Sequence, residues 1–271
     1  MMFALLVTGC GSDNSVKPVD NPDVNEPPEI KLGMIVHLNA TEQKLKEIYD
    51  TLIKNAGLYA KLNTVKFYDN LNTMQMGLDS GDVNEISVYK CVSDYLAAIN
   101  DKYTPANENS LSKLSDSFCF AMRKDDAELK AQLDKAIDEM KSDGTLDNLV
   151  KTYITDIKPE NIPAVEIPMV DGDETLKVGI TGDLPPLDFV TADGKPAGFN
   201  TAMLAEIAKR IDRNVEIVQI NSGARAAALN SNQIDVAFWA IIPASNDMPP
   251  TSTSPKASNS VRRISRTTSF I

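Results

Sequence analysis

The sequence predicts an α/β fold of two lobes, each with a parallel-rich sheet flanked by helices. Apolar strand-like runs alternate with segments whose apolar residues recur at helical spacing, a pattern typical of parallel sheets with helices on their faces. The alternation occurs twice, in residues 30–155 and 175–248, and a proline-containing linker at 156–174 separates these two units. The 271 residues are enough to bury a sizeable core, as one large domain or two small ones.

The first unit begins with an apolar run at residues 30–36, which predicts a buried strand. Asn39 and Glu42 then resemble a capping box, and the amphipathic helix that follows is expected to end at Gly57. The later elements predicted for this unit are a strand at 64–68, a helix at 72–79, a strand at 85–89, a helix at 91–99, a strand at 117–123 and a long helix from 127 to 153 that is broken at 142–144.

The second unit repeats the alternation, and its sheet is therefore also predicted to be parallel. Its predicted elements are a strand at 176–180, a loop at 182–186, an extended segment at 188–190, a turn at 192–194, a helix through 204–211, a strand at 215–220, a helix at 224–229 and a fully apolar strand at 236–242.

Charge and composition exclude several classes of partner and site. The chain has 27 basic and 38 acidic side chains, so its formal net charge is −11, which disfavours binding to nucleic acid. A single His excludes multi-His metal sites, and there is no zincin, nucleophile-elbow, P-loop or dinucleotide-binding motif. We therefore expect no metal and no cofactor. Cys91 and Cys119 could form a disulfide or remain two buried thiols.

The N-terminal residues Leu6-Val7-Thr8-Gly9-Cys10 resemble the lipobox of a bacterial lipoprotein signal peptide. The resemblance implies that Cys10 carries the acyl chains, palmitate among them, that hold the protein on a membrane. Polar residues 11–29 contain four prolines and suit an extended tether. No basic segment precedes the apolar run, so we expect the natural start to lie upstream of Met1. The alternative is a frayed apolar N-terminus.

Five motifs in the second unit, taken together, resemble the first lobe of the family 3 extracellular solute-binding proteins. They are Thr175–Ile180, Asp183-Leu-Pro-Pro-Leu-Asp-Phe189, Asp193-Gly-Lys-Pro-Ala-Gly-Phe-Asn200, Ala202–Lys209 and Ala226-Ala-Ala-Leu-Asn-Ser-Asn-Gln-Ile-Asp-Val236. In the first unit, the motifs at 68–71, 78–83, 120–129 and 140–146 resemble the second lobe of the same family. The lobes therefore stand in permuted order, which is sterically plausible because domain termini often lie close together.

The resemblance implies a periplasmic-binding-protein fold of type 2 and a receptor for an amino-acid ABC importer. Such a protein closes on a small polar solute, presents it to a permease, works outside the cytoplasm and is expected to be a monomer. The alternatives are a non-transporting surface sensor or interaction module of the same fold and a dehydratase-like enzyme. We expect no catalysis.

The C-terminal residues 251–271 contain six Ser, four Thr and four basic residues but no acid, unlike the rest of the chain. One interpretation of residues 249–271 is a basic disordered tail. The other is a shifted reading frame, because codons can be chosen whose neighbouring frame is acidic and contains the Ser-Pro-Tyr segment that precedes the hinge in this family.

Ligands of open parallel sheets bind beyond the carboxyl ends of the strands and between lobes that hinge shut. This rule predicts the candidate ligand-binding residues His37, Asn39, Asp69, Asn70, Tyr89, Lys90, Asp183, Leu187, Arg225, Trp239 and Ala240. Several have structural alternatives: a surface histidine for His37, a helix cap for Asn39, core packing for Tyr89 and Trp239, and a solvated helix start for Arg225.

Two anchors that the family uses for amino acids are missing at their usual places. The family holds the carboxylate with an Arg after the third strand of the first lobe, but the matching stretch 242–246 has none. It holds the α-amino group with an Asp where this chain has Tyr89, and Leu187 replaces the usual aromatic residue. An α-amino acid therefore does not follow from the resemblance, and the expected solute is an amino acid or a related organic acid or amine. Arg225 could bind a carboxylate in bidentate fashion from another position.

Overall fold

The computed structural model describes residues 29–35, 61–104, 115–172, 174–243, 259–260 and 266–268, together with Gln43, Glu47 and Asp50. Outside the described residues lie His37, Asn39, Cys10, the predicted tether up to residue 28 and most of the predicted helix before Gly57. No helix among those described is both long and apolar enough to cross a membrane.

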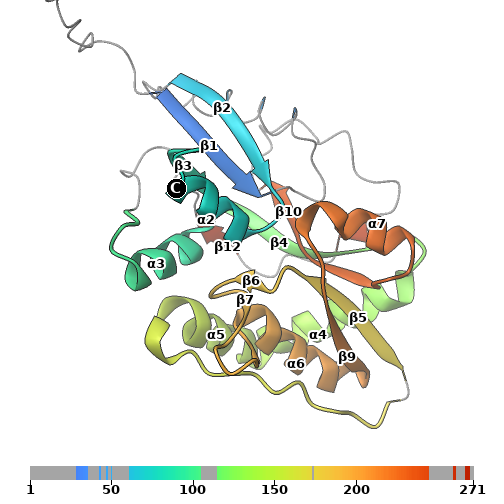
Figure 1. Cartoon of the computed structure of the whole chain (residues 1–271). Coiled ribbons are helices and arrows are strands. Elements are labelled where there is room, and N and C mark those ends of the chain that lie inside the picture. Colours follow the sequence, from blue (N-terminus) through green and yellow to red (C-terminus); the bar gives the residue numbers. More distant parts are fainter. Residues whose placement is uncertain are drawn as a thin grey trace, which may run out of the picture.

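The first sheet has three parallel strands in the order β2–β1–β3 (Figure 1). Its strands are β1 (Glu29–Ile35), β2 (Lys61–Tyr68) and β3 (Glu85–Ser87). Helix α2 (Leu71–Asp79) connects β2 to β3 and contacts all three strands, and α3 (Lys90–Ile99) follows β3. We call these strands and helices body I.

The second sheet has the order β11–β4–β10–β5–β9, where β11 is the short strand Asn259–Ser260. Its main strands are β4 (Ser115–Met122), β5 (Thr175–Ile180), β9 (Asn214–Gln219) and β10 (Val236–Pro243). Strands β9, β5 and β10 are parallel, as predicted. Strand β4 runs antiparallel to β10, so the prediction of parallel pairing is wrong for this strand. The β4–β10 pair is packed by the rings of Phe120 and Phe238, whose centroids are 4.5 Å apart at 85°.

Helices α4 (Ala127–Ser142) and α5 (Thr145–Val150) pack against α6 (Phe199–Ile211), beside β5 in Figure 1. The apolar stripe of α4 is buried in the same core as the inner face of α6. Residues 115–155, which the sequence groups with the first unit, thus join the second sheet by strand pairing and helix packing. We call the second sheet and its packed elements body II.

Several shorter elements complete body II. They are η2 (Lys151–Thr155), η3 (Pro159–Asn161), β6 (Asp183–Leu184), β7 (Asp188–Val190), β8 (Pro196–Ala197), η4 (Ser222–Ala224) and α7 (Arg225–Asn230). The predicted linker bridges to β8 through Ala164 and Ala197. Within the predicted tail, β11 (Asn259–Ser260) and β12 (Arg266–Thr268) pair antiparallel with β4.

The two cysteines of the described chain are buried and do not form a disulfide with each other. Cys91 lies in α3 and Cys119 in β4. Burial raises the pKa of each thiol to about 12, so both are protonated at neutral pH.

Candidate functional site

Body I and body II meet at the carboxyl ends of their strands. The backbone N–H of Ser222 donates to the Asp69 carbonyl oxygen at 3.0 Å, and Asn70 Nδ2 donates to Asn221 Oδ1 at 3.4 Å. Residues that follow β2 thus contact residues that follow β9. Parallel strands place their carboxyl ends at one edge of a sheet, so this junction is where a ligand is expected.

Asp183 of β6 lies at the N-terminus of α2, across the junction. Its Oδ2 accepts a hydrogen bond from the backbone N–H of Asn72 at 3.0 Å. The first turn of α2 has no acidic residue of its own, so Asp183 supplies the negative charge that a helix N-terminus favours. Burial nevertheless raises its pKa, and its buried Oδ1 has no hydrogen-bond partner in the described structure.

Arg225 starts α7 and is buried at the junction, with 7% of its surface exposed. Its Nε donates to the Ser222 carbonyl oxygen and its Nη1 to the Phe238 carbonyl oxygen, both at 3.2 Å. These two carbonyls fix the plane of the guanidinium group. Burial lowers the pKa of Arg225, while the charges of Tyr89 and Asp188 act to raise it. An anionic group beside Arg225 would therefore be favoured.

Asp188 is a buried carboxylate that the sequence analysis missed. Only 2% of its surface is exposed, and it accepts hydrogen bonds from the Gly182 backbone N–H at 2.8 Å, from Thr181 Oγ1 at 3.3 Å and from Asn200 Nδ2. Burial raises its pKa from 3.8 to about 6, against the lowering effect of these hydrogen bonds. The signal in the sequence was a charged residue between two apolar ones, Leu187 and Phe189.

The junction brings together Asp69, Asn70, Tyr89, Asp183 and Arg225 among the predicted residues. Asp69 takes part through its backbone carbonyl. Asn70 also caps α2, because its Oδ1 accepts from the Thr73 N–H at 2.9 Å. Tyr89 is half-buried and lies close enough to Arg225 to influence its pKa.

The remaining candidate residues either do not contact the junction or have side chains that the structure does not describe. Lys90 is exposed and pairs along its own helix with Asp94, at 2.6 Å. Leu187 is buried in the core. Trp239 and Ala240 belong to the backbone of β10, near the bulge of its pairing with β4, but the structure does not describe their side chains.

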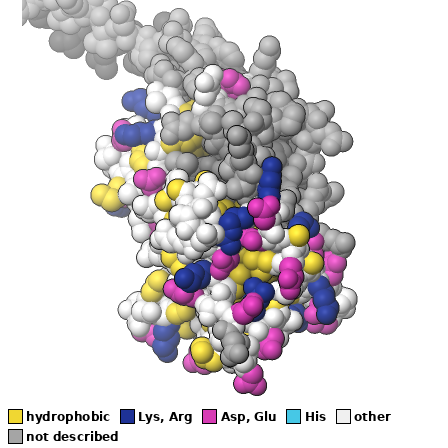
Figure 2. All heavy atoms as spheres, turned by 90° about the vertical axis from the view of Figure 1, so that its right-hand side faces the viewer, with side chains coloured by type: hydrophobic (Ala, Val, Ile, Leu, Met, Phe, Trp, Pro, Cys, Tyr) yellow, Lys and Arg dark blue, Asp and Glu magenta, His cyan; other side chains and the backbone are white. Residues whose placement is uncertain are grey.

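No part of the described chain gathers three or more His, Cys, Asp or Glu side chains in a way that could hold a metal ion. Figure 2 shows basic and acidic side chains interspersed over the described part of one face. The described part of this face therefore carries no surface of one sign.

The profile of one protein family, the bacterial extracellular solute-binding proteins, family 3, matches residues 16–156 and 176–245. A search of curated proteins found no match. Among solved structures, the ligand-binding component of an ABC-type import system from Staphylococcus aureus, with zinc bound, is 11% identical with a TM-score of 0.41. The match covers 87% of this chain and 60% of that one, so this chain spans less than two thirds of its length.

Two ligand-binding domains solved with glutamate are also similar. The GluR0 ligand-binding core from Nostoc punctiforme is 10% identical with a TM-score of 0.36, and the match covers 89% of this chain and 82% of that one. The AvGluR1 ligand-binding domain is 14% identical with a TM-score of 0.40, with coverage of 90% and 81%.

The α/β bodies and their polar junction define the class of two-lobed, type 2 periplasmic-binding-protein-like binding proteins. Within it, the chain belongs to family 3 of the bacterial extracellular solute-binding proteins, since the family profile matches most of its length. This confirms the family and the fold class predicted from the motifs. Members of the family are binding proteins rather than enzymes. The permuted order of the lobes stays a prediction.

Proposed function

We propose that this protein is an extracytoplasmic receptor that binds a small carboxylate-bearing solute between body I and body II. The observation that carries the proposal is the buried guanidinium of Arg225 at the junction, held in one plane by two backbone carbonyls. A buried guanidinium recognises a carboxylate with strong, charge-assisted hydrogen bonds. The protein acts by binding, without chemical conversion of the solute.

The absence of the usual anchors supports a solute other than an ordinary α-amino acid. No Arg stands in residues 242–246, and Tyr89 stands where the family has the Asp that holds an α-amino group. A tyrosine hydroxyl can donate to or accept from a neutral polar group. A small organic acid with a hydroxyl or carbonyl substituent fits these residues better than a zwitterion.

Closure of the two bodies on the solute would use the polar contacts at the junction. Two hydrogen bonds that involve side chains connect the bodies. The Asn72 N–H donates to Asp183 Oδ2, and Asn70 Nδ2 donates to Asn221 Oδ1. A few hydrogen bonds of this kind are worth about 1 kcal/mol each, so the bodies can separate to admit the solute. The closed, loaded form would then deliver the solute to the permease of an ABC importer.

The location follows from the lipobox. Cys10 carries the lipid, residues 11–29 act as a tether, and the protein is a monomer held at the outer side of the membrane. Incorporation of an alkyne-labelled palmitate into the full-length precursor, and its loss in Cys10→Ser, would test this part of the proposal.

Isothermal titration with a panel of small hydroxy and keto acids tests the binding site. Arg225→Lys should weaken the best acid about 30-fold, since loss of bidentate geometry at a buried charge costs about 2 kcal/mol. Arg213→Lys is the matched control, because Arg213 pairs with Glu174 at 2.7 Å in body II, on the surface. Binding of no acid, or equal losses in both variants, would refute the proposed site.

A further inference from the structure

A cavity of about 460 Å³ lies in body I, at the opposite end of α2 from the junction. Its lining includes Leu78 and Asp79 at the end of α2, whereas the junction uses Asn70 and Asn72 at its start. The nine residues of α2 span about 13 Å. The cavity is therefore separate from the site proposed above, and its size is typical of small-molecule sites, which span about 300–1,000 Å³.

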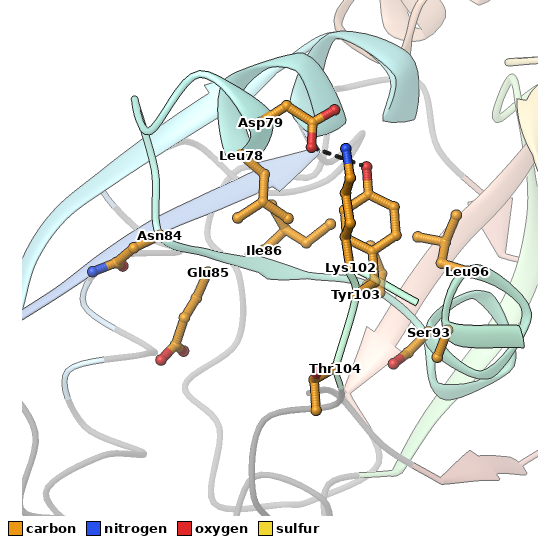
Figure 3. Close-up of a pocket in the computed structure, with 12 residues that line it drawn as sticks. Leu78, Asp79, Asn84, Glu85, Ile86, Ser93, Leu96, Lys102, Tyr103 and Thr104 are labelled. Carbon is orange, nitrogen blue, oxygen red and sulfur yellow. Dashed lines mark hydrogen bonds between the residues drawn. The ribbon is translucent and has the colours of Figure 1, made fainter. Parts of the chain in front are cut away.

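The walls of the cavity combine apolar and polar side chains, which come from α2, β3, α3 and the segment that follows α3 (Figure 3). Tyr103 closes one side in a fixed position: its hydroxyl donates to Asp79 Oδ1 and accepts from Gln75 Nε2, both at 3.4 Å. The apolar side chains that line the cavity are Leu78, Ile86, Val88, Leu96 and Ala97.

Glu85 is the polar feature of the cavity that lacks a structural explanation. It lies at the start of β3 and is half-buried, and burial raises its pKa. Among the described residues, no hydrogen bond or ion pair engages its carboxylate. Figure 3 shows Lys102 and Asp79 ending on one side of the cavity and Glu85 pointing to the other. A carboxylate removed from water without a partner is costly, and a cation beside it would offset that cost.

We propose that this cavity is a second binding site, which takes a small primary amine with an apolar body. The ammonium group pairs with Glu85, and the apolar body packs against Ile86 and Leu96, which also line the cavity. Apolar walls that bury the body of a ligand, with a few polar groups that orient it, are typical of small-molecule sites. The site is independent of the carboxylate site at Arg225.

The test is an NMR titration of ¹³C-methyl-labelled protein with phenethylamine, with 2-phenylethanol as the uncharged probe of similar shape. Phenethylamine should shift the methyl signals of Ile86 and Leu96 in a saturable way, and 2-phenylethanol should bind at least ten-fold more weakly. Glu85→Gln should weaken phenethylamine about ten-fold, whereas Glu166→Gln, a change at an exposed carboxylate in the linker, should leave its affinity unchanged.

Ala97→Leu provides a second variant that keeps Glu85 intact but fills the cavity. It should abolish the shifts from both probes while the circular dichroism spectrum stays that of the parent. The proposal is overturned if phenethylamine produces no saturable shift, if Glu85→Gln binds it as tightly as the parent, or if Ala97→Leu leaves binding unchanged.

Discussion

Replacement of Asp188 by Asn should remove a pH dependence of stability that this buried carboxylate imposes. Its pKa is about 6 in the folded protein, against 3.8 for an ordinary aspartate. A group whose pKa is raised by folding binds more protons in the folded than in the unfolded state, so stability falls as pH rises through that range. A pKa difference of about 2.2, at about 1.36 kcal/mol per pKa unit, gives about 3 kcal/mol between pH 4 and pH 6.

An asparagine at position 188 can keep a hydrogen bond to Asn200, because the side-chain amide of Asn200 can turn over. Asn200 donates through Nδ2 to Asp188, while its own Oδ1 is buried without a hydrogen-bond partner in the described structure. A flip of the Asn200 amide would present Oδ1 to the new side-chain NH₂ at position 188. The hydrogen bond is thereby kept and the buried charge is lost. We therefore expect Asp188→Asn to unfold at a higher urea concentration than the parent at pH 7.

The assay is urea unfolding of parent and variant at half-unit steps from pH 4 to pH 7, followed by circular dichroism. The free energy of unfolding of the parent minus that of Asp188→Asn should fall by about 3 kcal/mol across the range. Asp193→Asn is the control, because Asp193 is exposed on the turn that follows β7. Identical pH profiles for the parent and Asp188→Asn would refute the reasoning.

Three further predictions concern the scaffold. Gly198→Ala should destabilise the protein more than Gly194→Ala, because both glycines have positive φ but only at Gly198 would a Cβ lie 2.4 Å from a backbone carbonyl oxygen. Thermal unfolding compares the two variants, and equal effects would contradict the assignment. Leu133→Ala should cost about 2–5 kcal/mol in urea unfolding, because this side chain of α4 is 1% exposed; a loss below about 1 kcal/mol would mean that α4 does not pack as described. Cys91 and Cys119 should react with iodoacetamide only after unfolding, because burial raises the pKa of both thiols to about 12. Mass spectrometry measures the labelling, and rapid labelling of the native protein would contradict this prediction.

The positions of the elements could be predicted because apolar periodicity follows directly from burial on one face. Their partners could not all be predicted. Strand β4 is apolar enough to fit either sheet, and its choice of β10 depends on a register of backbone hydrogen bonds that no local pattern encodes. Helix α4 follows β4 and carries an apolar stripe. The stripe indicates that one face of α4 is buried, but it does not indicate that the partner is α6.

The candidate site was predicted where a topological rule applied. The rule for parallel sheets predicted Asp69, Asn70 and Arg225, and the structure places all three at the junction. That they bind a ligand stays a prediction. Asp188 was missed because it begins the three-residue strand β7, which is too short to give a periodic signal. Its burial depends on Asn200, twelve positions later in the chain, whose amide reaches back to it in the folded protein.

Under the proposed function, Arg225 and Asp188 together make the junction suited to a carboxylate. Burial lowers the pKa of the arginine and raises that of the aspartate, so the folding of body II keeps both groups in places that disfavour their charged forms. The negative charge of Asp188 favours the protonated form of Arg225. The hydrogen bonds that the Asp188 carboxylate accepts come from Gly182, Thr181 and Asn200. A solute carboxylate that bound Arg225 directly would offset part of the cost that burial imposes on this guanidinium group. The guanidinium group is already oriented in the folded protein, so binding would not have to order it. The free energy of binding the solute would therefore be more favourable than for a mobile arginine.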